Sequence, residues 1–256
     1  MPDNRIQTYT ELSESTIRRI SHDTDQWTGF LETASRMYKY SYSDQLLIHA
    51  QRPDATACAE YDLWNQRMGR YVRRGSKGIA LIDYSGDVPA IRYVFDVSDT
   101  GARERSRPVS LWRIEPEHNQ VISSMLVDYY GASEFAGLRD QLWTAAANLA
   151  QEYFDGHSAL VHAILAEIDG EEYNRDAGER WFLDSVTVSA AYALMNRCGL
   201  EPKEYMDEAD FTPLYEYLSP QTVSMLGEAV NQIDREVLRE IEITLRNHER
   251  AQQREN

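Results

Sequence analysis

Basic and aromatic side chains are concentrated between Arg36 and Ile82. This stretch holds eight basic and four acidic residues, a local charge of +4, whereas the whole chain carries −16. Arginine and lysine could neutralise the phosphates of a nucleic acid, and exposed tyrosine or tryptophan rings could stack on unpaired bases. The alternative is that the rings are core and that the cations pair with the chain's own acids, which composition alone favours. The basic residues are Arg36, Lys39, Arg52, Arg67, Arg70, Arg73, Arg74 and Lys77.

A short sequence inside this stretch, G-S-K-G at Gly75–Gly78, could suggest a phosphate-binding loop. It lacks the spacing of a P-loop and does not open onto a helix, so nucleotide hydrolysis is not predicted. A tight hairpin turn accounts for both glycines and places Lys77 at its tip, where the ammonium group could meet a phosphate.

The residues typical of catalysis lack the spacing that catalysis needs. A zinc peptidase uses H-E-x-x-H, which the sequence does not contain. His157 and His162 are five residues apart, about 140° around a helix. The acidic runs Glu171–Glu172 and Asp207–Asp210 are interpreted as solvated loop carboxylates. We therefore predict no catalytic residue, no metal and no cofactor; a peptidase with an unrecognised metal site would be revealed by a zinc assay.

Local patterns predict the elements that position the basic stretch. A short apolar helix from Asp44 to Gln51 is ended by Pro53, and a second helix over 61–68 stops at Gly69. Three strands follow, at 70–74, 78–83 and 90–97, and form a small antiparallel sheet packed on helices. In the third strand Ile91, Tyr93, Phe95 and Val97 share one face, with Arg92, Val94 and Asp96 on the other.

The segment from Thr100 to Pro108 is predicted as a polar loop. It contains three arginines and one acidic residue and could extend the basic track, although a solvated loop without function is the commoner case.

Helical patterns dominate the remainder of the chain. Residues 1–24 are predicted as a polar leader with a short amphipathic helix, and the next helix carries core residues such as Trp27 and Phe30. Beyond Pro116, helices are predicted at 117–130, 133–154, 157–169, 179–198 and 220–252. The last has one apolar stripe, formed by Val223, Leu226, Val230, Ile233, Val237, Ile241 and Leu245. The predicted fold class is α+β, with a small antiparallel sheet and packed helices in the N-terminal half, followed by a mostly helical domain.

Composition limits the functional classes. A pI of about 4.8 argues against a surface that binds nucleic acid everywhere, but it permits a local basic groove. No apolar run approaches the ~20 residues that span a bilayer, and the first residues do not form a signal peptide. Cys58 and Cys198 lie far apart without metal-ligand spacing, which is typical of free thiols. We predict a cytoplasmic protein without a membrane partner.

Three ordered motifs in the basic stretch resemble a known family. They are Y-x-Y-S-x-x-D-Q-L-L-I-x-A-Q-x-P-x-A-T, then W-N, then G-R-x-V-R-R-G-S-K-G-I-A-L. This pattern is similar to the amino-terminal domain of the ArdC-like antirestriction proteins, a single-stranded-DNA-binding module also found at the start of large proteins of conjugative elements. The similarity covers Trp27 to His118, and we assign residues 25–118 to this domain.

The resemblance implies a set of DNA-binding residues. Arg70, Arg73, Arg74 and Lys77 would contact the backbone of a single strand, and Arg52 is assigned to the same interface. Tyr40, Tyr42 and Tyr71 are candidates for base stacking. Ser43, Gln45 and Gln51 would donate or accept hydrogen bonds at the groove. Trp64 matches the family's pattern, although it could instead belong to the core. Binding without base specificity would coat transferred DNA and shield it from host nucleases.

The family's second domain is zinc-peptidase-like, and residues 119–256 resemble it only distantly. Because the zinc motif is absent, we predict a helical domain, a peptidase fold that has lost its metal. A different class of function also fits the sequence: the acidic helical half could mimic DNA and inhibit a host defence enzyme. Replacing Arg73, Arg74 and Lys77 by glutamate would separate the two hypotheses.

Overall fold

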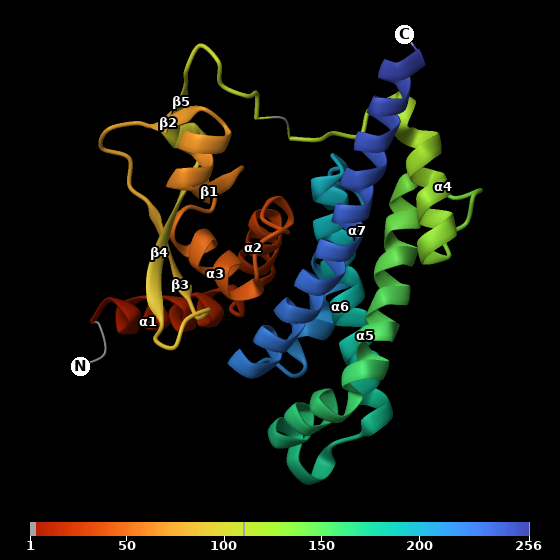
Figure 1. Ribbon diagram of the computed structural model, residues 1–256. Helices are drawn as coiled ribbons and strands as arrows, with labels where there is room; N and C mark the ends of the chain where they lie inside the picture. Colours follow the sequence, from red (N-terminus) through yellow and green to blue (C-terminus); the bar gives the residue numbers. More distant parts are fainter. Residues whose placement is uncertain (1–3, 110, 256) are drawn as a thin grey trace.

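The computed structural model describes residues 4–109 and 111–255, and the fold is α+β (Figure 1). The N-terminal half contains three helices and the five strands of the described residues, and the C-terminal half contains four long helices. The helices are α1 (Asn4–Ile20), α2 (Thr24–Arg36), α3 (Tyr42–Gln51), α4 (Asn119–Tyr130), α5 (Leu138–Asp169), α6 (Arg175–Arg197) and α7 (Pro220–Glu255). The strands are β1 (Cys58–Glu60), β2 (Arg70–Val72), β3 (Ile79–Asp83), β4 (Ala90–Asp96) and β5 (Thr100–Ala102).

The larger sheet is antiparallel, with the strand order β1–β4–β3. Ala80 of β3 lies opposite Tyr93 of β4. Val94 and Leu81 are fully buried in a small core cluster with side chains of α3. Because side chains alternate along a strand, Tyr93 lies on the opposite, outer face of the sheet. The burial of β4 therefore follows the predicted alternation.

The smaller sheet corrects the prediction for the strand at 70–74. β2 pairs with β5 and not with β3, and Tyr71 lies opposite Gly101. The segment expected to be a polar loop from Thr100 therefore begins as a strand. Strand pairing uses backbone groups, so a polar composition does not prevent it. A Cβ atom at Gly101 would lie 2.4 Å from the ring of Tyr71, so glycine is what lets that ring cross the backbone.

Caps and turns fix the local structure of the basic stretch. The hydroxyl of Ser41 accepts a hydrogen bond from the backbone N–H of Asp44 at 3.2 Å and caps α3. The helix expected over 61–68 is helical over 61–67, and Leu63–Arg67 form a π-helical turn within it. Gly69 follows it with φ +66°, a left-handed conformation that favours glycine, as predicted.

The C-terminal half is a bundle of α4, α5, α6 and α7. The predicted apolar stripe of α7 is buried throughout, and each of its seven side chains is at most 2% exposed. The helices expected at 133–154 and 157–169 form one helix, α5, because Gly156 keeps helical backbone in its middle. Helix α6 begins at Arg175, earlier than the expected residue 179.

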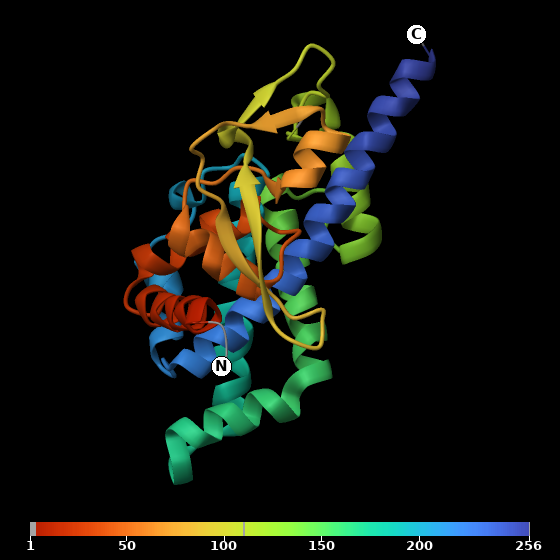
Figure 2. The ribbon, with the colours of Figure 1, turned by 60° about the vertical axis from the view of Figure 1, so that its left-hand side comes forward.

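One hydrophobic core joins the two halves. It contains Trp27 and Phe30 of α2, Tyr42 of α3 and the inner faces of the bundle helices. The indole N–H of Trp27 donates to the hydroxyl of Ser189 in α6 at 3.0 Å. In Figure 2, α7 passes beside the N-terminal half and its C-terminal end extends beyond it. The sheets are therefore carried by helices that are themselves anchored in the bundle.

Two further features concern helix hydropathy and the cysteines. Within the described residues, no helix has the length and apolarity needed to cross a membrane. Both cysteines are free thiols; Cys198 is buried and Cys58 is half-buried.

Candidate nucleic-acid interface

A strongly basic segment is built by β2, β5 and the residues that flank them. We call residues 67–77 and 100–109 the basic ribbon. It contains eight basic residues and one acidic residue, Glu104, a formal charge of +7 in a chain of −16. Besides the strand pairing, the backbone N–H of Arg107 donates to the carbonyl of Met68 at 2.9 Å. Backbone pairing thus joins two basic stretches that are separate in the sequence.

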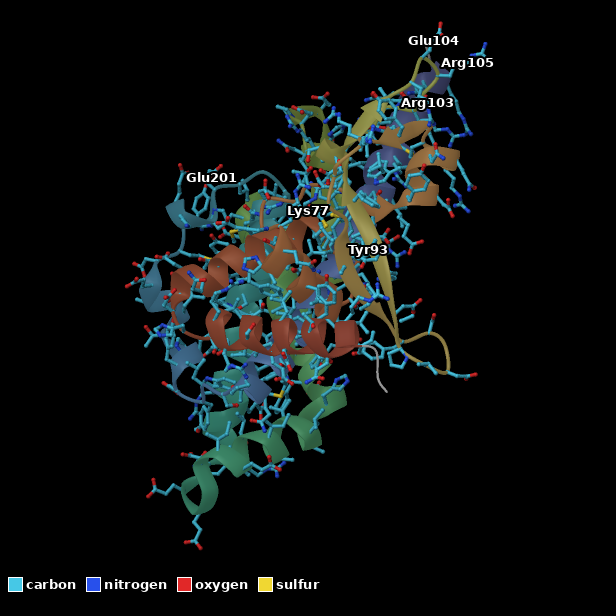
Figure 3. All side chains as sticks on the ribbon, turned by 90° about the vertical axis from the view of Figure 1, so that its left-hand side faces the viewer. Lys77, Tyr93, Arg103, Glu104, Arg105 and Glu201 are labelled. Atoms are coloured by element: carbon cyan, nitrogen blue, oxygen red, sulfur yellow. The ribbon has the colours of Figure 1, made fainter. Side chains whose placement is uncertain are left out.

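The cations of the basic ribbon form no ion pair with any acidic residue that the structure describes. Within the described part of the chain, no carboxylate oxygen lies within 4.0 Å of any of the eight. Arg70 donates through Nε to Thr100 Oγ1, and Arg73 through Nη1 to the carbonyl of Ser98, each at 2.7 Å. The charges are thus positioned but not neutralised. The other six cations are all exposed: Arg67, Arg74, Lys77, Arg103, Arg105 and Arg107. Figure 3 shows Arg103 and Arg105 at the loop that follows β5, and Lys77 near Tyr93.

Tyr71 places an exposed ring among these cations. Its side chain is 44% exposed, and the guanidinium of Arg103 lies 5.8 Å from the ring centroid, within the range of a cation–π contact. The ring crosses Gly101, which fixes its height above the small sheet. A ring held in this way could stack on a base while neighbouring arginines contact phosphates.

A second exposed ring, Tyr93, was not among the predicted site residues. It is 42% exposed on the outer face of β4. A Cβ atom at Gly78 would lie 3.1 Å from the Tyr93 side chain, so the ring lies over the turn that carries Lys77. The strand alternation did place Tyr93 on the face opposite Val94. The sequence did not show how β3 and β4 pair, and only their register brings Tyr93 to the turn at Gly78.

The corner between β4 and β5 is held by two carboxylates, the buried Asp96 and the half-buried Asp99. Asp96 Oδ2 accepts from the backbone N–H groups of Thr56 and Ala57 at 2.7 and 2.9 Å. Burial acts to raise the pKa of Asp96, but hydrogen bonds from Ser98, Ala57 and Thr56 outweigh it and hold that pKa below its ordinary value. Asp99 pairs with Arg52 at 2.5 Å. The predicted DNA contact Arg52 is therefore already neutralised, and its ion pair instead fixes the start of β5.

Three predicted contacts lie in the protein interior, which corrects their assignment to a surface. Tyr42 is 6% exposed and meets Phe30 edge-to-face in the shared core. Gln45 is 1% exposed and donates to the backbone carbonyls of Ala34 and Met37. Trp64 is 3% exposed, and its indole N–H donates to the carbonyl of Phe95 at 2.8 Å. All three side chains build the scaffold and do not line its surface.

The remaining predicted contacts lie away from the basic ribbon or serve the scaffold. Tyr40 is half-buried and donates to the carbonyl of Cys58 at 2.7 Å. The amide of Gln51 donates to the carbonyl of Ala80 at 2.8 Å and accepts from the backbone N–H of the same residue at 3.0 Å, which ties α3 to β3. Ser43 is exposed at the start of α3, and its hydroxyl is hydrogen-bonded to the hydroxyl of Ser41. The structure therefore brings Arg70, Tyr71, Arg73, Arg74 and Lys77 together and leaves the others outside.

The acidic half presents the opposite surface. Residues 119–256 hold 25 acidic and 10 basic residues, a formal charge of −15. Among the described residues, no group of three or more His, Cys, Asp or Glu side chains is arranged to hold a metal ion. His157 contacts the carbonyl of Tyr153 at 2.8 Å, whereas His162 is hydrogen-bonded to the hydroxyl of Tyr173, so the two histidines have separate surroundings.

Comparisons with protein-family models, with curated proteins and with solved structures gave no match for this chain.

Proposed function

We propose that this protein binds single-stranded DNA along the basic ribbon, without base specificity, and shields transferred DNA of a mobile element or phage from host nucleases. One observation carries the proposal: among the described residues, the exposed ring of Tyr71 lies beside Arg103 in a group of cations without a carboxylate partner, and the exposed ring of Tyr93 covers the turn that carries Lys77. The ArdC-like motifs support the same assignment, because G-R-x-V-R-R-G-S-K-G spans β2 and the turn before β3.

The proposed mechanism divides the binding between charge and stacking. Arg73, Arg74 and Lys77 contact backbone phosphates and release condensed counterions, which makes affinity fall steeply with salt. Tyr71 and Tyr93 stack on bases, and each stacked base contributes about 1–3 kcal/mol. Neither contact reads base edges, so the protein binds many sequences. A duplex hides its bases within the stack and offers only its phosphates.

The test is fluorescence anisotropy with a labelled strand of about 20 nucleotides and the corresponding duplex across a salt series. The proposal predicts tighter binding to the single strand, with log affinity falling by about 0.7 for each contacted phosphate per tenfold rise in salt. Equal affinity for the two forms would remove the stacking part of the mechanism. No binding to either form at low salt would refute the proposal.

A second function is favoured by the charge of the bundle. With −15 on residues 119–256, this half could present an array of carboxylates to a DNA-handling enzyme and act as a DNA mimic. In that case, reversing the charges of the basic ribbon would leave protection of DNA in cells unchanged. Neutralising exposed acids of the bundle would abolish that protection.

A further inference from the structure

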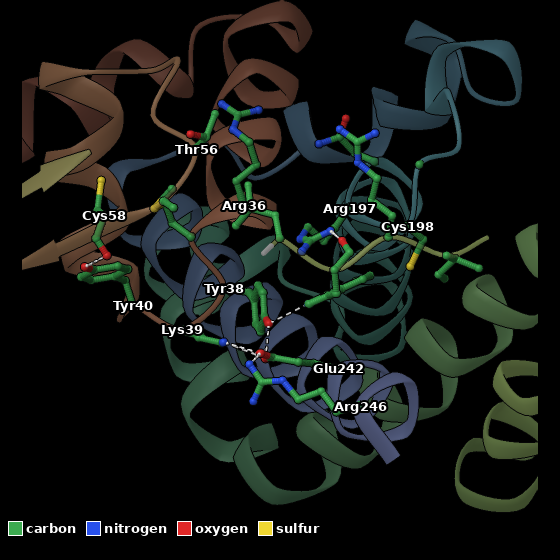
Figure 4. A pocket seen from close by; sticks show the side chains of 18 of the residues that line it. Arg36, Tyr38, Lys39, Tyr40, Thr56, Cys58, Arg197, Cys198, Glu242 and Arg246 are labelled. Atoms are coloured by element: carbon green, nitrogen blue, oxygen red, sulfur yellow. Dashed lines mark hydrogen bonds and ion pairs between the residues drawn. The ribbon is translucent and has the colours of Figure 1, made fainter. Parts of the chain in front are cut away.

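A cavity of about 720 Å³ lies at the junction of the two halves. Its walls come from the end of α2 and the α2–α3 connection, the start of β1 and the residues before it, the linker at 111–115, the end of α6 and the part of α7 around Glu242 and Arg246 (Figure 4). The volume falls in the range of about 300–1,000 Å³ that small-molecule sites occupy. Apolar lining residues such as Met37 and Ile114 alternate with charged ones.

The charge of this junction cavity is positive in an acidic protein. It is lined by five basic and two acidic residues, a formal charge of +3. One acid, Glu242, is already satisfied, because it accepts from Tyr38 at 2.6 Å and from Lys39 at 2.8 Å and also pairs with Arg246. These hydrogen bonds and charges hold the pKa of Glu242 below its ordinary value although burial opposes them. Apart from Glu242 and its two partners, the charged lining residues are three arginines, Arg36, Arg113 and Arg197, and one acid, Glu115.

Two half-buried guanidinium groups line the cavity from opposite sides of the junction. Arg36 of α2 donates through Nε and Nη2 to the carbonyls of Ala55 and Pro53, at 2.9 and 2.6 Å. Arg197 of α6 lies 3.5 Å above the ring of Trp112 and donates through Nη1 to the carbonyl of the same residue at 3.1 Å. Figure 4 shows Arg36 and Arg197 on different walls of the cavity.

Neither guanidinium forms an ion pair with a described residue. In the described chain, no carboxylate oxygen lies within 4.0 Å of Arg36 or Arg197. Nη1 of Arg36, and Nε and Nη2 of Arg197, have no acceptor among the described residues. Burial lowers the pKa of both guanidinium groups, which expresses the cost of keeping a charge there. The carboxylates of Glu32, Asp54 and Asp96 near Arg36, and of Glu242 near Arg197, oppose this shift without outweighing it. Arg113, on the linker wall, is exposed and likewise without a carboxylate partner. An anionic ligand would satisfy all three.

We propose that the junction cavity binds a small phosphorylated ligand of about the size of a nucleoside monophosphate. The planar fork of arginine fits phosphate oxygens in a bidentate manner, and the apolar part of the wall suits a ring or sugar. Two sources could supply this chemistry: a free nucleotide, or the phosphorylated end of a DNA strand. The site is separate from the basic ribbon, so it does not depend on the proposed DNA-binding function.

The test uses the whole protein, with calorimetry and thermal unfolding as readouts. The probes are inorganic phosphate, deoxyadenosine monophosphate and, as a control, deoxyadenosine. A strand with a 5′-phosphate and the same strand with a 5′-hydroxyl separate the two sources. We expect saturable binding of a phosphorylated probe and none of deoxyadenosine. A preference for the 5′-phosphorylated strand, without binding of the free nucleotide, would identify a strand end as the ligand.

Variants locate the binding. Arg197→Gln and Arg113→Gln are each expected to weaken the binding about tenfold or more, since each removes charge-assisted hydrogen bonds. Arg113 is exposed, so its variant remains informative if Arg197→Gln does not fold. The matched control is Arg180→Gln, an exposed residue of α6 outside the cavity, which should change affinity less than about twofold. Reversing Arg73, Arg74 and Lys77 to glutamate should leave deoxyadenosine monophosphate binding unchanged.

Two results would overturn this site. The first is the absence of saturation with every phosphorylated probe up to about 10 mM, which corresponds to an affinity too weak for a built site. The second is an equal loss of binding in Arg180→Gln and Arg197→Gln, which would indicate a general charge effect.

Discussion

The two halves of the molecule share one core but carry very different charges. Residues 1–118 hold 16 basic and 17 acidic residues and are almost neutral, whereas residues 119–256 carry −15. Within residues 1–118, the basic ribbon carries a formal charge of +7, so the rest of this half is acidic as well. Positive charge is therefore confined to one surface, the basic ribbon, and is not spread over the whole N-terminal half.

This arrangement has a consequence for any anionic partner. Screening limits the reach of exposed charges to about 8–10 Å in ordinary salt. The acidic bundle therefore does not prevent a strand from binding at the ribbon, but it disfavours contact with the rest of the protein. A nucleic acid would be confined to one track.

The largest expected effect tests whether the halves are truly joined. Phe30 of α2 is 1% exposed in the shared core, so Phe30→Ala should lower the free energy of unfolding by about 3–5 kcal/mol. Because the core is continuous, both halves should lose structure in one transition, as measured by circular dichroism and tryptophan fluorescence. As a comparison, Leu81→Ala removes a side chain from the small cluster beneath the sheet. Two separate unfolding transitions in Phe30→Ala would contradict a single core shared by the two halves.

The next prediction compares exposed rings in the two halves. Tyr71→Ala and Tyr93→Ala should each weaken binding of a single strand by about 1–3 kcal/mol, the contribution of one stacked base. The control is Tyr129→Ala, because Tyr129 is 67% exposed on α4 of the acidic half and lies outside the ribbon. Anisotropy at constant salt measures all three. If the control variant lost as much affinity as the ribbon variants, stacking at the ribbon would be ruled out.

The smallest effect concerns two carboxyl groups whose pKa values shift in opposite directions. Hydrogen bonds lower the pKa of Asp96 in the sheet half, so its stabilisation is present above the ordinary value of 3.8 and is lost as the pH falls through the folded-state pKa. Burial raises the pKa of Asp234 in α7, whose Oδ1 has no hydrogen-bond partner. Asp234 therefore lowers the free energy of unfolding increasingly as the pH rises above 3.8 towards its folded-state pKa.

The corresponding asparagine variants should therefore behave oppositely at neutral pH. Asp96→Asn should be less stable than the wild type, and Asp234→Asn more stable, in urea unfolding at about pH 7. Both differences should shrink at about pH 3, where the carboxyl groups of the unfolded chain are protonated. A destabilised Asp234→Asn at neutral pH would show that the buried carboxylate has a partner.

Sequence patterns predicted elements well where a side chain's surroundings depend on its own strand or helix. The stripe of α7, the left-handed Gly69 and the alternation in β4 followed from local spacing. Pairing between distant segments did not, because β2 meets β5 through backbone groups and through Gly101, which no periodicity reveals.

The candidate site was predicted only in part for the same reason. The motif placed Arg70 to Lys77 on one strand and turn, and the structure keeps them together. Gln45 belongs to the first of the three motifs and Tyr42 stands at one of its unspecified positions, yet α3 turns both into the core. The motif does not distinguish a binding residue from a packing one. Tyr93 became a candidate only through its contact with Gly78.

The central claim is that single-stranded DNA binds at the basic ribbon because of its charge. Its most direct test is the triple variant Arg73→Glu, Arg74→Glu, Lys77→Glu, compared with Arg180→Glu, Arg239→Glu, Arg250→Glu, which makes the same change of charge on exposed residues of the bundle. Anisotropy with a labelled single strand should show the ribbon triple losing at least about 100-fold in affinity and about 2 units of salt slope. The bundle triple should retain nearly all of its affinity. Equal losses in the two triples, or none in the ribbon triple, would contradict the account.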